Sequence, residues 1–351
     1  MRLLLAASVL LLAVAVATAA GAQSCLDGKD VIEASEAEDE YEYTSPGQGV
    51  DAAGVAWEGL PGHALHLLGR LGKDEACFAG GEVRGPYDEG SVYECSSKHC
   101  PEHVCPEPCL AYHTTAALAP EVDAGLTVID DFRGSDYGDG ISLERASGDV
   151  LIRRAYLHDL HDDAVESDWG RHSVTIVDSL FDRVTVGLAT RQRKKGGSKA
   201  SANEVWELRS SLIRLHAWPN TYRMEPGHSG FFKADKKKKR QVTYRITGNV
   251  FFAGPIASEG AVLFPIATKT EECENNLLFW SGSPEAWQEI LDDGDGADKM
   301  NNRERLAALG EAFEDCYDVI VKPAGQSEGD FVAEHWTPRA NAWRAAHAAG
   351  G

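Results

Sequence analysis

The sequence LHDLHDDAVESD, residues 157–168, places five carboxylic acids and two histidines within twelve residues. Carboxylates this close repel one another, so one of them must retain a proton, bind a cation or face a basic group. An acid with a raised pKa beside an ionised carboxylate is the pair that hydrolysis of a glycosidic bond requires. Calcium would also hold the cluster, and it could support a lyase or a purely structural role. The acids are Asp159, Asp162, Asp163, Glu166 and Asp168.

A non-catalytic interpretation of these acids is equally open. They could belong to a charged turn in which each acid pairs with a nearby arginine. The arginines available are Arg153, Arg154, Arg183 and Arg191. A catalytic cluster predicts a groove and perturbed carboxylates, whereas a structural cluster predicts closed salt bridges.

The strands that must position the acids recur along the chain. Apolar residues hold the same three places in segments that begin at Leu126, Val150, Val174, Trp206 and Tyr244. Alternation within each segment predicts a strand, and recurrence at intervals of 24 to 38 residues predicts one strand-bearing unit per coil of a solenoid. The absence of a regular leucine signature favours a parallel β-helix over leucine-rich repeats. At the sixth place of the repeat, Ser179, Ser211, Asn249 and Asn276 are expected to stack at a turn.

This register brings two acids together. Asp139 and Asp163 each lie thirteen residues after the start of their segment, and Gly187 holds that place in the next one. Neighbouring strands lie about 4.8 Å apart, so the two aspartates should face each other with Asp162 beside them. Glu144 and Asp168 share another place of the register. Ile141, Val165 and Ala189 align as inward apolar residues, so the acids belong to one outer face. The candidate catalytic residues are Asp139, Asp162, Asp163, Glu166 and Asp168.

Charge is distributed unevenly along the chain. The net charge is −21, yet residues 183–240 contain fifteen Lys or Arg against four acids, which gives this segment +11. A basic segment in an acidic protein favours attraction of a polyanion to one face over general adhesion to nucleic acid or membrane. The KKKKR run taken alone is more typical of a solvated loop. Uronate or sulfate groups of a glycan would suit the candidate binding residues. These are Arg191, Arg193, His228 and Lys233, of which His228 has a general acid and a turn residue as alternatives.

The first residues and the cysteines predict an exported protein. Residues 1–22 combine one positive charge, an apolar stretch and a small-x-small end, which is typical of a signal peptide. Disulfides are expected in an oxidising compartment, with zinc binding by the central cysteine cluster as the alternative. Cys273 and Cys316 alone lie beyond that cluster, so a bond between them is predicted. The cysteines are Cys25, Cys77, Cys95, Cys100, Cys105, Cys109, Cys273 and Cys316.

These patterns divide the chain into four parts. A signal peptide over 1–22 precedes an acidic segment over 23–60. The β-helix is predicted over 61–285, with a Cys-rich insertion at 95–109 and basic insertions at 191–204 and 223–241. Residues 286–351 form a C-terminal helical or capping segment, because HWTPRANAWRAAHA is typical of an amphipathic helix.

The middle of the chain resembles the pectin-lyase-like superfamily of right-handed parallel β-helices, over roughly residues 60–285. GDGISL and HDDAVE are similar to the N-T-D-G-I and D-D motifs of polygalacturonase-type glycoside hydrolases. The resemblance implies that Asp139, Asp162 and Asp163 protonate the leaving oxygen and activate water. YGD replaces N-T-D, VTVGL lacks the histidine of G-H-G, and ATRQR lacks R-I-K.

A second resemblance covers more motifs. Largely uncharacterised secreted β-helix proteins share the pattern of DGI at Asp139, HDDAVESD at His161, VDSLFDRVTVG at Val177 and PGHSGFFK at Pro226. It implies the fold and says little about a reaction. The full prediction is an all-β, single-stranded right-handed parallel β-helix (solenoid) with short C-terminal helical segments.

The sequence therefore predicts a secreted carbohydrate-active protein. The leading hypothesis is a glycoside hydrolase acting on an acidic polysaccharide, and the alternatives are a polysaccharide lyase or a non-catalytic glycan-binding or structural protein. We expect a monomer that binds neither nucleic acid nor membrane after removal of its signal. No cofactor other than calcium is expected. Phosphate-binding loops, Rossmann glycine motifs and a G-x-S-x-G nucleophile are absent from the sequence.

Overall fold

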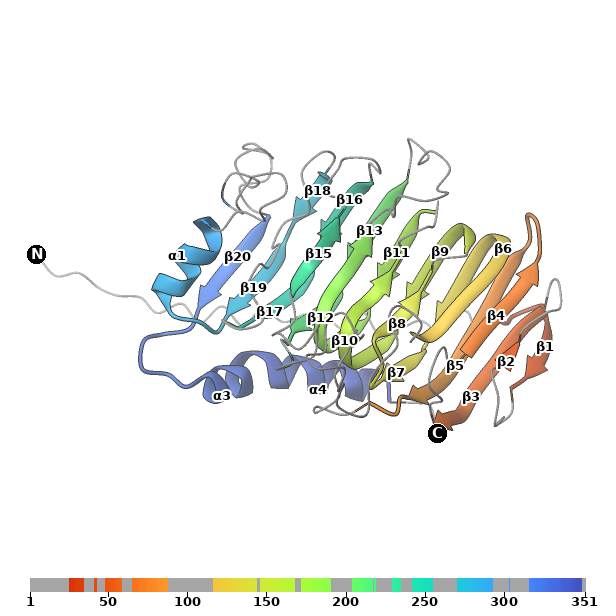
Figure 1. The fold of residues 1–351 in the computed structure, drawn as a ribbon, viewed down its shortest axis with the longest axis horizontal. Coiled ribbons are helices and arrows are strands. Elements are labelled where there is room, and N and C mark those ends of the chain that lie inside the picture. Colours follow the sequence, from red (N-terminus) through yellow and green to blue (C-terminus); the bar gives the residue numbers. More distant parts are fainter. Residues whose placement is uncertain are drawn as a thin grey trace, which may run out of the picture.

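The computed structural model is mostly β, with helices near the C-terminus (Figure 1). This confirms the coarse prediction of a β fold with C-terminal helical segments. Among the strands of the described residues, every recorded pairing is parallel. The structure describes residues 25–34, 41–42, 48–58, 65–87, 116–143, 146–167, 172–190, 204–216, 218, 229–234, 242–254, 270–292, 303 and 316–348.

The strands form three parallel ladders. The first ladder contains the strands that the sequence repeat predicts. Near the middle of the chain, β5 (Glu75–Arg84) pairs with the second half of β6 (Ala116–Asp130), β6 pairs with β9 (Ser147–Arg153), and β9 pairs with β11 (Val174–Val177). Its members are β1 (Asp30–Glu33), β3 (Gln48–Glu58), β5 (Glu75–Arg84), β6 (Ala116–Asp130), β9 (Ser147–Arg153), β11 (Val174–Val177), β13 (Val205–Arg209), β16 (Thr243–Thr247) and β18 (Thr270–Glu274).

Long strands turn a corner and so belong to two ladders. The second halves of β10 (Tyr156–Glu166) and β12 (Leu180–Thr190) lie in the second ladder, and their first halves lie in the third. The second ladder contains β2 (Tyr41–Glu42), β4 (Leu65–Arg70), the first half of β6, β8 (Asp139–Ser142), β10 (Tyr156–Glu166), β12 (Leu180–Thr190) and β15 (Gly230–Ala234). The third contains the second halves of β3 and β5, then β7 (Arg133–Ser135), β10, β12, β14 (Leu212–Leu215), β17 (Val250–Ala253), β19 (Asn276–Trp280) and β20 (Tyr317–Val321).

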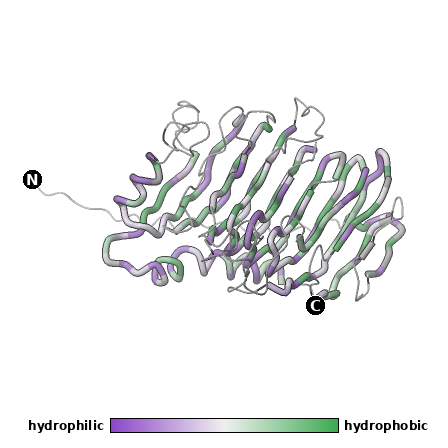
Figure 2. The backbone as a smooth tube through the Cα atoms, viewed as in Figure 1, coloured by the Kyte–Doolittle hydropathy of each residue, from purple (hydrophilic) through white to green (hydrophobic). Residues whose placement is uncertain are grey.

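The predicted register holds from the second repeat onward. Val150 pairs with Val174, Val174 with Trp206, and Trp206 with Tyr244. Each of these four side chains is buried in one continuous apolar core. Figure 2 shows apolar stretches repeating from strand to strand, interrupted by polar residues. The first repeat is displaced by one residue, because Leu126 lies opposite residue 149 rather than Val150.

A row of buried polar side chains links the turns between the first and third ladders, as the sequence predicts. The backbone N–H of Ser179 donates to Ser211 Oγ over 3.2 Å, and that of Ser211 donates to Asn249 Oδ1 over 3.0 Å. Asn249 in turn donates its backbone N–H to Asn276 Oδ1 over 3.1 Å. The residue before each of these four positions has a positive φ of 49° to 65°. The stacked side chains therefore satisfy backbone donors that a tight left-handed turn leaves without ladder partners.

The C-terminal helices cover the outer side of the third ladder. They are α3 (Glu328–Phe331), the π-helical turn η4 (Val332–Trp336) and α4 (Thr337–Ala346), and they run beneath successive strands of the ladder in Figure 1. Phe331 and Trp336 pack with Leu180 and Phe252 in a second apolar cluster. The expected amphipathic helix exists, but it lies along the side of the ladder instead of capping an end.

Two disulfides lie near the two ends of the described chain, and each joins a strand to a residue outside the strands. The Cys273–Cys316 bond confirms the predicted pairing, and the other bond joins Cys25 to Cys77. The disulfides are consistent with an oxidising compartment. No helix among the described residues is long and apolar enough to cross a membrane. Residues 1–22 and the four cysteines at positions 95–109 lie outside the described residues.

The predicted segment boundaries differ from the extent of the ladders. Strands β1, β2 and β3 lie within 23–60, and β20 lies within 286–351. Both segments therefore contribute strands to the sheet. Helix α1 (Pro284–Asp292) spans the predicted boundary between residues 285 and 286.

Candidate functional site

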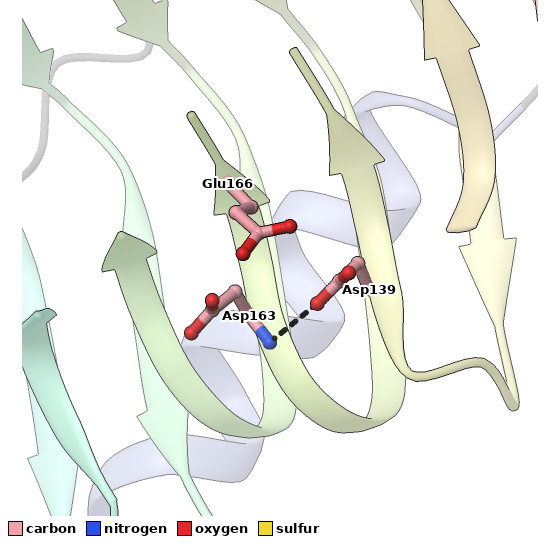
Figure 3. A group of neighbouring side chains, drawn as sticks. All are labelled: Asp139, Asp163 and Glu166. Carbon is pink, nitrogen blue, oxygen red and sulfur yellow. Dashed lines mark hydrogen bonds between the residues drawn. The ribbon is translucent and has the colours of Figure 1, made fainter. Parts of the chain in front are cut away.

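Two aspartates from adjacent strands of the second ladder lie next to each other. Asp139 begins β8, and Asp163 lies in β10, which pairs with β8 through Val165 and Ile141. The backbone N–H of Asp163 donates to Asp139 Oδ1 over 3.1 Å (Figure 3). The predicted juxtaposition of these aspartates is therefore confirmed.

A β-bulge brings Asp162 into the same cluster. The register between β10 and β12 shifts between Leu160 and Asp163, so β10 has one residue more than β12 over this stretch. The backbone N–H groups of His161 and Asp162 donate to carbonyl groups of residues 137 and 138. Regular alternation would send two consecutive side chains to opposite faces, whereas a bulge re-aims one of them.

The bulge overturns two predicted neighbours in the next strand. Asp163 lies opposite Val186 instead of Gly187, and Val165 lies opposite Leu188 instead of Ala189. An extra residue in one strand displaces every later pairing by one position. A constant count along the sequence cannot detect that displacement.

Lys233 supplies the positive charge of the cluster. It lies opposite Ala189 in β12, which in turn lies opposite Glu166 in β10. Its Nζ is 3.2 Å from Asp162 Oδ1 and 2.9 Å from Asp163 Oδ2. The sequence predicts Lys233 to bind an acidic substrate; in the structure its ammonium group contacts these two carboxylates.

The four acids are buried. Glu166 and Lys233 alternate with the core residues Val165 and Phe232, so they lie on the face of the second ladder opposite the core. The side chains of Asp139, Asp162, Asp163 and Glu166 belong to residues only 0–2% exposed. The acids share one face, as predicted, but that face is covered instead of open.

Burial and mutual repulsion favour the protonated forms of the carboxylic acids in this cluster. Burial raises the pKa of Asp139 and of Asp163 well above the usual range, and the charge of Asp162 raises both further. Burial alone would lower the pKa of Lys233, but Asp162 and Asp163 outweigh it and raise that pKa well above the usual value. The side-chain hydrogen bond with Glu166 lowers the pKa of Asp139 and so offsets only part of this rise. The cluster therefore combines carboxylic acids whose protonated forms are favoured with a charged lysine beside Asp162 and Asp163.

The same acids have the donor set of a hard cation site. Asp139, Asp163 and Glu166 each offer one carboxylate oxygen, and these oxygens lie within 4.8 Å of one another. Oxygen donors of this kind suit calcium or magnesium. A cation would replace a proton on these acids, because both neutralise the same oxygens.

Other predicted acid–arginine contacts lie away from this cluster. Asp159 Oδ1 is 2.9 Å from Arg183 Nε. Arg153 and Arg154 both pair with Asp130, at 2.7 and 2.6 Å. The structural interpretation, which predicts closed salt bridges, therefore fits Asp159, and it also fits Asp162 and Asp163, although their partner is Lys233 instead of an arginine. Glu144, Asp168, Arg191, Arg193 and His228 lie outside the described residues.

Sequence reasoning missed the aromatic contact beside the bulge. Trp218 is buried and stacks on His161, with ring centroids 4.7 Å apart. A tryptophan in the irregular segment after β14 shows no periodicity, so no strand pattern could place it. Its one signal was the occurrence of a large aromatic residue beside the basic insertion.

Comparison with known proteins identifies no relative of this chain. No family model, no curated protein and no solved structure matches it.

Proposed function

We propose that this protein is a secreted carbohydrate-active protein built as a right-handed parallel β-helix, and that its carboxylate cluster hydrolyses glycosidic bonds of an acidic polysaccharide. The observation that carries the proposal is the geometry of the cluster: oxygens of Asp139, Asp163 and Glu166 lie within 4.8 Å of one another, and Lys233 Nζ lies 2.9 Å from Asp163 Oδ2. Burial raises the pKa of Asp139 and so favours its protonated form, while the charge of Lys233 favours the ionised form of Asp163. Glycosidic hydrolysis needs this combination of a protonated acid and an ionised carboxylate.

The two sides of the cluster take different roles in this reaction. Asp139 donates its proton to the glycosidic oxygen, which leaves as an alcohol. Asp163 attacks the anomeric carbon, and Asp139 then removes a proton from the water that releases the sugar. Oxygens of Asp139 and Asp163 lie within 4.8 Å of each other. That upper limit is below the roughly 6.5–9.5 Å that leaves room for an attacking water, so it favours the retaining over the inverting mechanism.

The acidic substrate is inferred from the charge of the neighbouring sequence. Residues 183–240 have a net charge of +11 in a chain of −21, so one region of the molecule attracts polyanions. Lys233 belongs to this segment and meets the carboxylates directly. Arg191, Arg193 and His228 remain predicted contacts to uronate or sulfate groups of the glycan.

The test is incubation of the purified protein with acidic and neutral polysaccharides, with and without calcium. New reducing ends from an acidic glycan, absent with Asp139→Asn and Asp163→Asn, support the hydrolase. Asp318→Asn is the matched control, because Asp318 is exposed on β20. Anomeric products followed by NMR should retain configuration. Unsaturated sugar ends would instead show a lyase, and no product from any glycan would overturn the proposal.

A second candidate function is a non-catalytic glycan-binding or structural protein. The burial of the acids favours it, because Asp163 is 0% exposed and Lys233 already contacts two of the carboxylates. In this case Asp163→Asn changes stability or calcium binding without any effect on glycan products. The two functions are thus separated by the same set of variants.

A further inference from the structure

An indole ring supports the bulge that carries two of the acids. Trp218 Nε1 donates to the carbonyl oxygen of Leu160 over 3.0 Å, at the residue where the register of β10 shifts. Its ring stacks on that of His161, with an angle of 10° between the planes. Trp218 is 2% exposed, so both contacts are made out of water.

The indole is itself fixed by groups from neighbouring strands. The guanidinium carbon of Arg183 lies 4.8 Å from the centre of the Trp218 ring, and the His216 ring meets it edge-on at 4.5 Å. Arg183 is anchored by its ion pair with Asp159. The position of Trp218 is therefore set by at least two side chains that do not belong to the bulge.

These contacts bear on the carboxylates through the backbone. The bulge contains His161 and Asp162 and ends at Asp163, so its conformation decides where both aspartates point. Thr185 Oγ1 also donates to the Leu160 carbonyl, over 3.3 Å, from the facing strand. Without the indole, this carbonyl would keep the longer of its two side-chain hydrogen bonds and His161 would lose its stacking partner.

We propose that Trp218 is a positioning residue, whose indole holds the β10 bulge so that Asp162 and Asp163 face Lys233 and Asp139. Its indole acts through Leu160 and His161, the two residues of β10 that it contacts at the bulge. The catalytic consequence rests on the proposed function, whereas the effect on the bulge does not.

The test compares Trp218→Phe, which keeps an aromatic ring but loses the N–H donor, with Trp218→Leu, which loses both. Trp206→Phe is the matched control, because Trp206 is equally buried and lies in the first ladder. Hydrogen exchange of a peptide spanning residues 157–166 reports bulge opening directly. We expect exchange to accelerate about three- to tenfold with Phe, as for loss of one hydrogen bond, and more with Leu. The control should leave this peptide unchanged.

Kinetics on the cleaved glycan separate positioning from general stability. We expect kcat to fall about tenfold with Phe and on the order of a hundredfold with Leu, with KM within about twofold of the original. Unchanged exchange in residues 157–166, or faster exchange with unchanged kcat, would overturn the positioning role. If the original protein cleaves no glycan, the hydrolase proposal fails, and the exchange result alone decides whether Trp218 holds the bulge.

Discussion

Replacing Lys233 by methionine should destabilise the protein in a strongly pH-dependent way. The substitution keeps the apolar stem and removes the ammonium group that contacts Asp162 and Asp163. Removing one partner of a buried ion pair typically costs about 3–5 kcal/mol, because the other charge stays buried without compensation. The folded Lys233→Met variant avoids this cost when one of the two carboxylates takes up a proton.

The cost of that proton sets the pH dependence. An aspartate with an ordinary pKa of 3.8 resists protonation by about 1.36 kcal/mol per pH unit above that value. Protonation then costs about 1.6 kcal/mol at pH 5 and about 5.7 kcal/mol at pH 8. The loss in free energy of unfolding should therefore stay near 1–2 kcal/mol at pH 5 and reach about 3–5 kcal/mol at pH 8.

The expected decrease in stability with rising pH has the same sign as the contribution of Asp163 in the original protein. The pKa of Asp163 is already raised in the folded protein, so its contribution to stability is greatest below the unfolded pKa and falls as pH rises. Without Lys233, the pKa of Asp163 rises further, and the fall becomes steeper and extends to higher pH. The pKa of Lys233 itself lies too high for its own titration to matter between pH 5 and 8.

Urea unfolding at pH 5 and pH 8 measures this effect. Lys322→Met is the matched control, because Lys322 Nζ donates to the carbonyl oxygen of Gln326, which does not titrate. Its loss should be about 0.5–1.5 kcal/mol at both pH values. The double variant Asp163→Asn/Lys233→Met should recover much of the loss at pH 8. An equal loss from Lys233→Met at the two pH values, or no recovery in the double variant, would refute the electrostatic reasoning.

Three further predictions concern the scaffold around the site. Replacing Cys273 and Cys316 together by alanine should lower the free energy of unfolding by about 2–4 kcal/mol in urea, since their bond closes a segment with a sequence separation of 43. Asn249→Ala should lower the free energy of unfolding by about 1–3 kcal/mol and speed hydrogen exchange of neighbouring buried amides. The reason is that the Asn249 side chain accepts from the Ser211 N–H and donates to the Leu208 carbonyl oxygen. Burial opposes the charged form of His347, but its hydrogen bonds to Asp178 and to the Trp343 carbonyl, together with nearby negative charge, outweigh burial and raise its pKa. Docking of α4 should therefore weaken as pH rises through that value. Proteolysis of the C-terminal helices at pH 6 and 8 measures this, and His347→Gln should abolish the difference.

The repeat was predictable where an apolar residue occupies the same inward position in each successive segment. Val150, Val174, Trp206 and Tyr244 pair as the sequence indicates, because inward apolar positions recur whatever the length of the loops between them. The displacement of the first repeat did not harm the prediction for Asp139. The offset between paired residues is 23 at Arg133 and Tyr156 but 24 at Ile141 and Val165, so one extra residue within β10 restores the expected alignment.

Other features depended on tertiary contacts that leave no local pattern. The apolar residues at Leu212 and Val250 alternate as core residues would, yet they pack under the C-terminal helices. A covered outer face and a core give the same alternation. The bulge at Asp162 was likewise invisible, because consecutive aspartates in a strand fit a regular register as well as a shifted one.

The stability of Asp139→Asn distinguishes a catalytic cluster from a structural one more sharply than its activity does. Parallel ladders stack corresponding side chains about 4.8 Å apart, so the pairing of β8 with β10 forces Asp139 toward Asp163 without relieving their repulsion. An asparagine reproduces the protonated acid, since its Oδ1 can accept from the Asp163 N–H and its amide can donate to Glu166. If the proton on Asp139 serves a reaction, the asparagine variant should be more stable than the original protein, by an amount that grows with pH, while hydrolysis is lost. If the cluster exists to bind a cation, the same variant removes a ligand and calcium no longer stabilises the protein. A variant that is both less stable in the absence of calcium and fully active would contradict the assignment of Asp139 as the acid.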